Sequence, residues 1–370
     1  MNKETRRVAL QVLLFVLTFI TTTIAGAEWT HGKSIYGPFT WNDFLSGMHF
    51  SVPFLLILTV HEFGHYFTAR HHNVNSSLPY YIPMPPFPFS IGTMGAIIRL
   101  RERIHSMKIN FDIGIAGPLA GFVMAILVLF YGFINLPPAE YIYQIHPEYE
   151  KFGPDYENFV YGHQEGIIDV VIGKNILFQF FESFIADTDR MPNPHEIMHY
   201  PYLFAGFLAL VFTSLNLIPV GQLDGGHVLY GLVGYQRHKI IASVIFVGFM
   251  FYAGLGMVYP QQPLDDLIFY VPAYIIFLTF CFKGLKLPIR DTVMYALLVF
   301  AGQFIWAWIS PGITGYSGWL LFGLIIGRMA GVHHPQATIE EPLDTNRQIL
   351  GWLALLIFVI CFSPNPIEMQ

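Results

Sequence analysis

Long apolar runs alternate with short polar stretches along the whole chain. Because about 20 apolar residues cross the hydrocarbon core of a bilayer, each long run predicts a membrane-spanning helix. The runs cover roughly residues 8–26, 47–70, 112–135, 200–219, 238–259, 267–283, 292–310, 316–332 and 348–363. Segment 224–235 is expected to continue the fourth run after a break at Pro219-Val220-Gly221. We therefore predict an all-α polytopic membrane protein with about eight or nine transmembrane helices.

Composition supports this class. Hydrophobic residues make up 54% of the 370 residues and charged residues only 12%, whereas soluble domains carry about 25% charged residues. The two cysteines, Cys281 and Cys361, each lie within an apolar run, so we expect core residues rather than a disulfide or a metal site. The partners expected are the lipid bilayer and other membrane proteins, with no nucleic acid.

The positive charges predict how the chain crosses the membrane. Of the 19 Lys and Arg residues, 15 fall within 1–7, 70–108, 236–239, 283–290 and 328–347. Since Lys and Arg accumulate on the cytoplasmic side, these segments and the N-terminus are predicted to be cytoplasmic. Run 8–26 is expected to be a retained helix, and the alternative is a signal peptide cleaved near Ala25-Gly26-Ala27. No transit peptide or lipidation motif is recognisable, which favours a bacterial inner membrane.

One stretch at membrane depth does not fit a helix. Five prolines between Ser76 and Ser90 forbid helical backbone, and Gly92–Leu100 has the pattern of a short strand. Non-helical backbone at that depth must be buried in protein or line a cavity. We predict a re-entrant Pro-rich loop and an edge strand that could pair with an unwound peptide. The alternative is a Pro-rich cytoplasmic connector.

The second apolar run ends in a HExxH motif, His61-Glu62-Phe63-Gly64-His65. Positions i and i+4 share one helix face, so His61 and His65 could bind one metal ion while Glu62 contacts its water. The helix is apolar on all sides, and ionisable groups inside a membrane span are costly unless they serve a function. The alternative is a pair of hydrogen-bonded core histidines.

A second polar group follows the break after the fourth run. Asp224 lies just beyond Pro219 and Gly221 and is flanked by glycine. A buried carboxylate needs a cation or a donor, and a catalytic zinc site built on His61 and His65 lacks one protein ligand. Asp224 is therefore the candidate third ligand, with a helix-capping aspartate as the alternative.

Two weaker features complete the pattern. Gly117 and Gly121 form a small-xxx-small face that lets another helix or strand approach closely. The acidic and aromatic segment 136–199 is predicted to be extracytoplasmic and ends in a second HExxH, His195 to His199. Pro194 and Pro201 leave barely one helical turn there. We interpret this match as coincidental, although it could bind zinc adventitiously.

The two membrane motifs together resemble the site-2 protease family of intramembrane zinc metalloproteases. The resemblance consists of HExxH followed by NxxPxxxxDG, here Asn216, Pro219, Asp224 and Gly225, and it covers roughly residues 47–235. The sequence around Asp224 is most similar to the branch without a PDZ domain found in cyanobacteria and chloroplasts. Segment 136–199 occupies the place of a PDZ domain and is too short for one.

The resemblance implies a function and a set of roles. His61, His65 and Asp224 would bind one Zn²⁺ ion, Glu62 would be the general base, and Asn216 would hold the substrate carbonyl. The substrates would be single-pass transmembrane proteins, cleaved within their transmembrane segments. The alternatives are a membrane metal-ion transporter using the same His and Asp residues, and a surface metalloprotease built on the second HExxH.

The same motifs suggest three parts of the chain. Residues 1–46 would form an N-terminal transmembrane helix and outer loop, and 47–235 the metalloprotease core with its insertion 136–199. Residues 236–370 would form C-terminal transmembrane helices. The sequence predicts neither an oligomeric state nor a particular substrate.

Overall fold

A computed structural model describes residues 3–87, 90–161 and 170–369. Residues 88–89 of the Pro-rich stretch and 162–169 of the predicted insertion lie outside the described part. The chain divides into two compact units. The first comprises Met1–Arg103, Ala116–Leu215 and Leu356–Gln370, and the second comprises Ile104–Ile115 and Asn216–Leu355.

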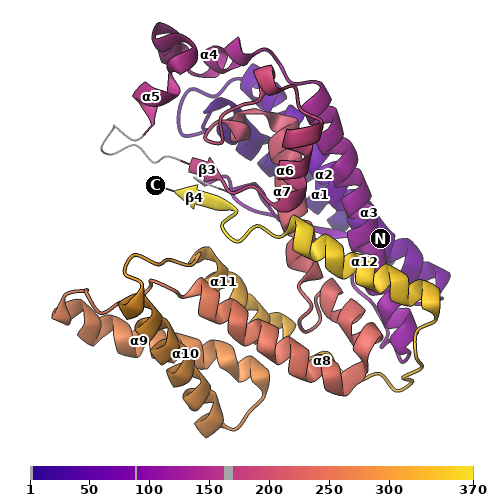
Figure 1. The fold of residues 1–370 in the computed structure, drawn as a ribbon. Helices are drawn as coiled ribbons and strands as arrows, with labels where there is room; N and C mark the ends of the chain where they lie inside the picture. Colours follow the sequence, from indigo (N-terminus) through magenta and orange to yellow (C-terminus); the bar gives the residue numbers. More distant parts are fainter. Residues whose placement is uncertain (1–2, 88–89, 162–169, 370) are drawn as a thin grey trace. The chain divides into compact units, whose positions relative to one another are not determined.

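Each apolar run predicted to form a helix overlaps a helix in the structure (Figure 1). These helices are α1 (Lys3–His31), α2 (Trp41–His71), α3 (Met107–Ile134), α7 (Pro201–Leu217), α8 (Asp224–Ala253), α9 (Leu264–Phe282), α10 (Ile289–Ile309), α11 (Gly318–Ile325) and α12 (Thr345–Cys361). The predicted mostly helical fold is thus confirmed. Cys281 and Cys361 are free and fully buried, as expected of core residues.

Within the described residues, five helices are long and apolar enough to cross a membrane. They are Lys3–His31, Trp41–His71, Met107–Ile134, Leu264–Leu285 and Ile289–Ile309. Three further apolar helices, Pro201–Leu217, Gly318–Ala330 and Thr345–Cys361, are shorter. The protein is therefore an integral membrane protein.

In the first unit, α1 and α2 pack through small residues. A Cβ atom added to Gly47 would lie 2.0 Å from the carbonyl oxygen of Thr23, so only glycine allows this approach. The hydroxyls of Thr23 and Ser51 are hydrogen-bonded at 2.7 Å across the same contact. The interface uses close backbone contact and buried polar bonds, as helix pairs in membranes commonly do.

Two short antiparallel sheets also belong to the first unit. β1 (Tyr80–Pro83) pairs with β2 (Thr93–Ile97), with Tyr80 opposite Ile97. The predicted strand at 92–100 is therefore present but shorter, and its partner arises from the Pro-rich stretch. β3 (Val170–Ile172) pairs with β4 (Ile367–Met369), a pairing that the sequence did not indicate (Figure 1).

The described part of segment 136–199 consists of short pieces that pack on the first unit. They are η1 (Ala139–Tyr141), α4 (Ile142–Ile145), η2 (Pro147–Asp155), α5 (Glu157–Val160), β3, α6 (Ile176–Phe184), η3 (Thr188–Arg190) and η4 (Ile197–His199). Asn175 caps α6 by accepting a hydrogen bond from the Phe178 backbone N–H at 2.9 Å. Phe181 then stacks on Phe133 of α3, and Phe178 meets the same ring edge to face. Aromatic packing thus anchors this segment.

The second unit contains the segment that follows the break. Residues 224–235 form the first part of α8, which is assigned as far as Ala253, and the continuation of the fourth run by this part stays a prediction. A kink at Gly234, whose φ is 75°, joins the two halves of α8. A glycine adopts this φ without the steric cost that a side chain would bring. α8 therefore consists of two helices that meet at this kink, and segment 224–235 is distinct from run 238–259, as expected. In the same unit a five-residue π-helix, Ile326–Ala330, follows α11.

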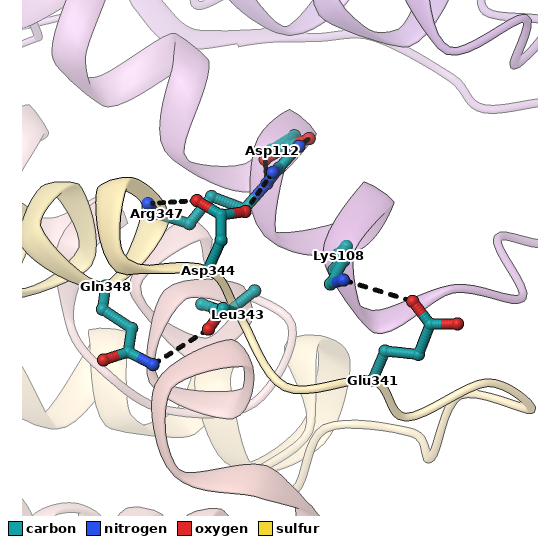
Figure 2. A network of polar contacts seen from close by, with 7 residues as sticks. All are labelled: Lys108, Asp112, Glu341, Leu343, Asp344, Arg347 and Gln348. Atoms are coloured by element: carbon teal, nitrogen blue, oxygen red, sulfur yellow. Dashed lines mark hydrogen bonds and ion pairs between the residues drawn. The ribbon is translucent and has the colours of Figure 1, made fainter.

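A polar network ties the start of α3 to the start of α12 within the second unit (Figure 2). The guanidinium of Arg347 donates through Nε and Nη2 to the two carboxylate oxygens of Asp112, both at 2.7 Å. Arg347 also pairs with Asp344, and Lys108 donates to Glu341 at 3.2 Å. The bidentate pair fixes orientation because the guanidinium fork matches the carboxylate.

Candidate active site

The HExxH motif lies in the C-terminal half of α2, a helix whose N-terminus is closed by a capping box between Thr40 and Asp43. His61, Glu62 and His65 are 6%, 5% and 7% exposed. The Nε2 atoms of His61 and His65 lie 3.1 Å apart. Two nitrogens bound tetrahedrally to one zinc ion are about 3.3 Å apart. The histidine pair therefore fits a metal ion without rearrangement of its helix.

Helix α3 makes room for this pair with glycines. A Cβ atom on Gly117 would lie 2.1 Å from Nε2 of His65, and one on Gly121 would lie 3.0 Å from Cβ of His61. A Cβ atom on Gly64 of α2 would lie 2.7 Å from the backbone oxygen of Ala116. The predicted small-xxx-small face is thus confirmed, and the element that approaches it is the HExxH helix.

The β1–β2 hairpin is fastened to the helices of the first unit. The hydroxyls of Tyr81 in β1 and Thr59 in α2 are hydrogen-bonded at 2.7 Å, and Thr59 lies two residues before His61. Thr21 of α1 donates to the carbonyl oxygen of Gly92 at 2.6 Å. In the described part of the chain β2 pairs with one strand, and its Met94 and Ile97 side chains are exposed.

Asp224 and Asn216 belong to the second unit. Asn216 lies in the last turn of α7, and Asp224 is the first residue of α8, with both side chains half-buried. The turn between them is tight: Gly221 has φ of 61°, and a Cβ atom there would lie 1.7 Å from the carbonyl oxygen of Gly331. The predicted break before Asp224 is confirmed.

The position of Asp224 bears on its capping alternative. The N-cap residue of α8 is Leu223, whose side chain makes no cap hydrogen bond. Asp224 stands one position inside the helix, where a carboxylate interacts favourably with the positive end of the helix dipole. Asp224 is therefore not the N-cap residue of α8, and its role as third ligand stays a prediction.

The second HExxH does not form the helix that gives such a motif its geometry. Only a single 3-10 turn, η4, covers Ile197–His199, and the ring of His195 stacks on Tyr161 with centroids 4.0 Å apart. Another histidine, His146, lies beside His199 with its Nε2 3.2 Å from that of His199. Sequence reasoning missed His146, because no spacing rule links a residue to a motif about fifty positions away.

A buried His-Glu-His face on an apolar helix defines a membrane metalloprotein with the donor set of a peptidase. Comparison of the sequence with known families agrees with this class. The profile of peptidase family M50 matches residues 49–258, more than half of the chain. The chain belongs to peptidase family M50, and the resemblance to site-2 proteases is thereby confirmed.

Several plant proteins are similar to this chain. It is 25% identical over 238 residues to "Probable zinc metalloprotease EGY2, chloroplastic" of Oryza sativa subsp. indica, covering 64% of this chain and 36% of that protein. It is 29% identical over 186 residues to the EGY1 protein of Oryza sativa subsp. japonica, covering 49% and 27%. For EGY1 of Arabidopsis thaliana the identity is 26% over 207 residues, covering 54% and 31%.

The chain spans about a third of the length of the curated relatives it matches. All three of those relatives are described as chloroplastic, in line with the predicted branch of the family. No solved structure matches the chain.

Proposed function

We propose that this protein is an intramembrane zinc metalloprotease that hydrolyses peptide bonds within transmembrane segments of membrane proteins. The observation that carries the proposal is the buried His61–His65 pair, with Nε2 atoms 3.1 Å apart on a helix long and apolar enough to cross a membrane. In this proposal His61, His65 and Asp224 hold one Zn²⁺ ion. Membership of peptidase family M50 favours the protease over a metal-ion transporter built on the same residues.

In the proposed hydrolysis, the zinc ion, Glu62 and Asn216 each have one role. Zinc, when bound by this set, lowers the pKa of a water ligand to about 7. The Glu62 carboxylate accepts a proton from the attacking water and delivers it to the nitrogen of the departing amine. The Asn216 amide donates a hydrogen bond to the substrate carbonyl. Glu62 is only 5% exposed, which keeps bulk water from competing for its proton.

The hairpin supplies a place for the substrate. A transmembrane helix hides its carbonyls in internal hydrogen bonds, so it must unwind before hydrolysis. We propose that the unwound segment pairs with β2, whose exposed Met94 and Ile97 offer apolar contacts. The hydrogen bond between Thr59 and Tyr81 ties the hairpin to the HExxH helix. Substrate and general base would then be held by one connected structure.

The proposal includes the arrangement in the membrane. In this proposal the chain has eight or nine spans and a re-entrant Pro-rich loop and lies in a bacterial inner membrane. The Lys and Arg distribution supports a cytoplasmic N-terminus. The parts 1–46, 47–235 and 236–370 remain our proposed functional division. A single transmembrane helix can unwind more easily than a helix that is packed within a bundle. Single-pass membrane proteins are therefore the proposed substrates.

The test uses purified protein and a single-pass substrate reconstituted in the same vesicles. We expect Glu62→Gln to lose cleavage by at least about 10³-fold while keeping its metal, because only the proton acceptor is removed. Equal cleavage by Glu62→Gln and wild type would refute the mechanism. Zinc flux into protein-containing vesicles without any proteolysis would instead support the transporter.

A further inference from the structure

A second group of metal-ligand side chains lies in the first unit, outside the HExxH of α2. It comprises His146, between α4 and η2, and Glu196 and His199, just before α7. One ligand atom from each residue lies within 4.8 Å of the others. Glu196 is 2% and His199 8% exposed, while the His146 side chain is 28% exposed. Two of the three groups are therefore buried and do not meet by chance in solvent.

The hydrogen bonds made by the two imidazoles determine which nitrogens carry protons. Nδ1 of His199 lies 3.1 Å from the carbonyl oxygen of Thr30, and Nδ1 of His146 lies 3.2 Å from a carboxylate oxygen of Glu148. A carbonyl and a carboxylate only accept, so both Nδ1 atoms donate. Each neutral ring then presents a lone pair at Nε2.

These lone pairs face each other. The two Nε2 atoms are 3.2 Å apart, and with both protons held at Nδ1 no hydrogen bond can join them. Facing lone pairs repel unless a cation lies between them. Histidines that bind metals characteristically donate their other ring N–H to a carbonyl or carboxylate, and both rings here do so.

Glu196 completes the set with a negative charge. Its Oε2 lies 3.4 Å from Nε2 of His199, and its Oε1 accepts a hydrogen bond from the Tyr161 hydroxyl. Tetrahedral zinc ligands are about 3.3 Å apart, which matches both measured separations. A cation would compensate for burying the carboxylate.

We propose that His146, Glu196 and His199 bind a second Zn²⁺ ion, with a water in the fourth position. The set of two His and one Glu suits zinc among the common divalent ions because imidazole is its preferred ligand type. The ion would be structural. It would fasten the short pieces between α3 and α7 to one another, and through the bond from His199 to Thr30 it would fasten them to α1. Glu196 is a ligand in this site and does not act as a base.

The test is a metal count on full-length protein purified without a histidine tag. We expect about two zinc ions per chain in wild type and about one in His146→Ala or Glu196→Gln. Glu196→Gln keeps the shape of the side chain and can still accept from Tyr161, so it tests the charge without a cavity. His195→Ala is the matched control and should keep about two ions, since His195 stacks on Tyr161 outside the group.

A second readout separates this inference from the proposed protease. The double variant His61→Ala/His65→Ala should keep the ion at His146, and adding His146→Ala should remove it. Wild type should also resist proteolysis between residues 139 and 161 more than His146→Ala does. One ion that depends on His61 and His65 but not on His146 would overturn the second site and leave the protease intact. Loss of the second ion in His195→Ala, with His146→Ala unaffected, would also overturn it.

Discussion

Replacing Gly117 with alanine is expected to disable the HExxH site while leaving α3 folded. The added Cβ would lie 2.1 Å from Nε2 and 2.5 Å from two carbons of the His65 ring. Unbonded atoms need about 3.4 Å or more, so the ring must move by about 1.3 Å. Such a displacement separates a ligand nitrogen from its partner, and a misplacement of about 1 Å commonly costs about 10²-fold in rate.

The fold should survive the same change. Alanine is favoured over glycine in a helix by about 1 kcal/mol, and the group in its way is a side chain rather than backbone. We therefore expect Gly117→Ala to retain its thermal unfolding midpoint and to lose about 10²-fold in substrate cleavage together with part of its metal. Cleavage of a single-pass substrate, zinc content and thermal unfolding measure the three quantities.

Two further glycines calibrate the result. Gly121→Ala would place its Cβ 3.0 Å from Cβ and 3.2 Å from Nδ1 of His61 and should lose much less activity, because His61 must yield by only a few tenths of an ångström. Gly248→Ala has no heavy atom within 4 Å and should leave activity unchanged. Full cleavage and full zinc content in Gly117→Ala would refute the argument that glycine positions His65.

Other regions of the fold give three more predictions. Arg347→Met should lower the free energy of unfolding by about 1 kcal/mol, because it breaks the bidentate pair with Asp112. Lys108→Met should lower it by less than about 0.5 kcal/mol, because the pair of Lys108 with Glu341 is solvent-exposed. Chemical denaturation of both variants would measure the difference. Thr40→Ala should cost about 1 kcal/mol by removing the capping box of α2, seen as faster backbone hydrogen exchange in its first turn. Gly221→Ala should reduce both folding yield and zinc content, because its positive φ and the Gly331 oxygen leave no room for a side chain; normal yield would show that the turn can open.

The helices could be predicted from the sequence because one strong physical requirement governs apolar runs in a membrane. Backbone groups in a bilayer must bond within their own segment, so a run such as 112–135 has little choice but to become a helix. The break at Pro219 could also be predicted from the sequence. The sequence also separated 224–235 from run 238–259, and the structure places the division at Gly234, whose backbone is non-helical within α8.

The sequence did not predict which distant segments pair as strands. β3 and β4 join Val170–Ile172 to Ile367–Met369, and three-residue strands carry no periodicity that could reveal a partner. The Pro-rich stretch correctly excluded a helix, yet its first residues form β1, because proline at the end of a strand removes only one donor. The hydrogen bond from Tyr81 to Thr59 follows from that strand and had no signal of its own.

The two HExxH motifs show that a five-residue sequence pattern alone does not determine the geometry of a metal site. In α2 the motif lies within a helix of 31 residues, so the i and i+4 rings meet with Nε2 atoms 3.1 Å apart. At residues 195–199 the backbone forms only a 3-10 turn, so His195 points to Tyr161 and His146 takes the place beside His199. The proposed role of the glutamate differs accordingly: we propose Glu62, next to the histidine pair, as a base, and Glu196, which lies 3.4 Å from a ring nitrogen of His199, as a ligand. Helical continuity, more than motif identity, therefore decides which residues converge.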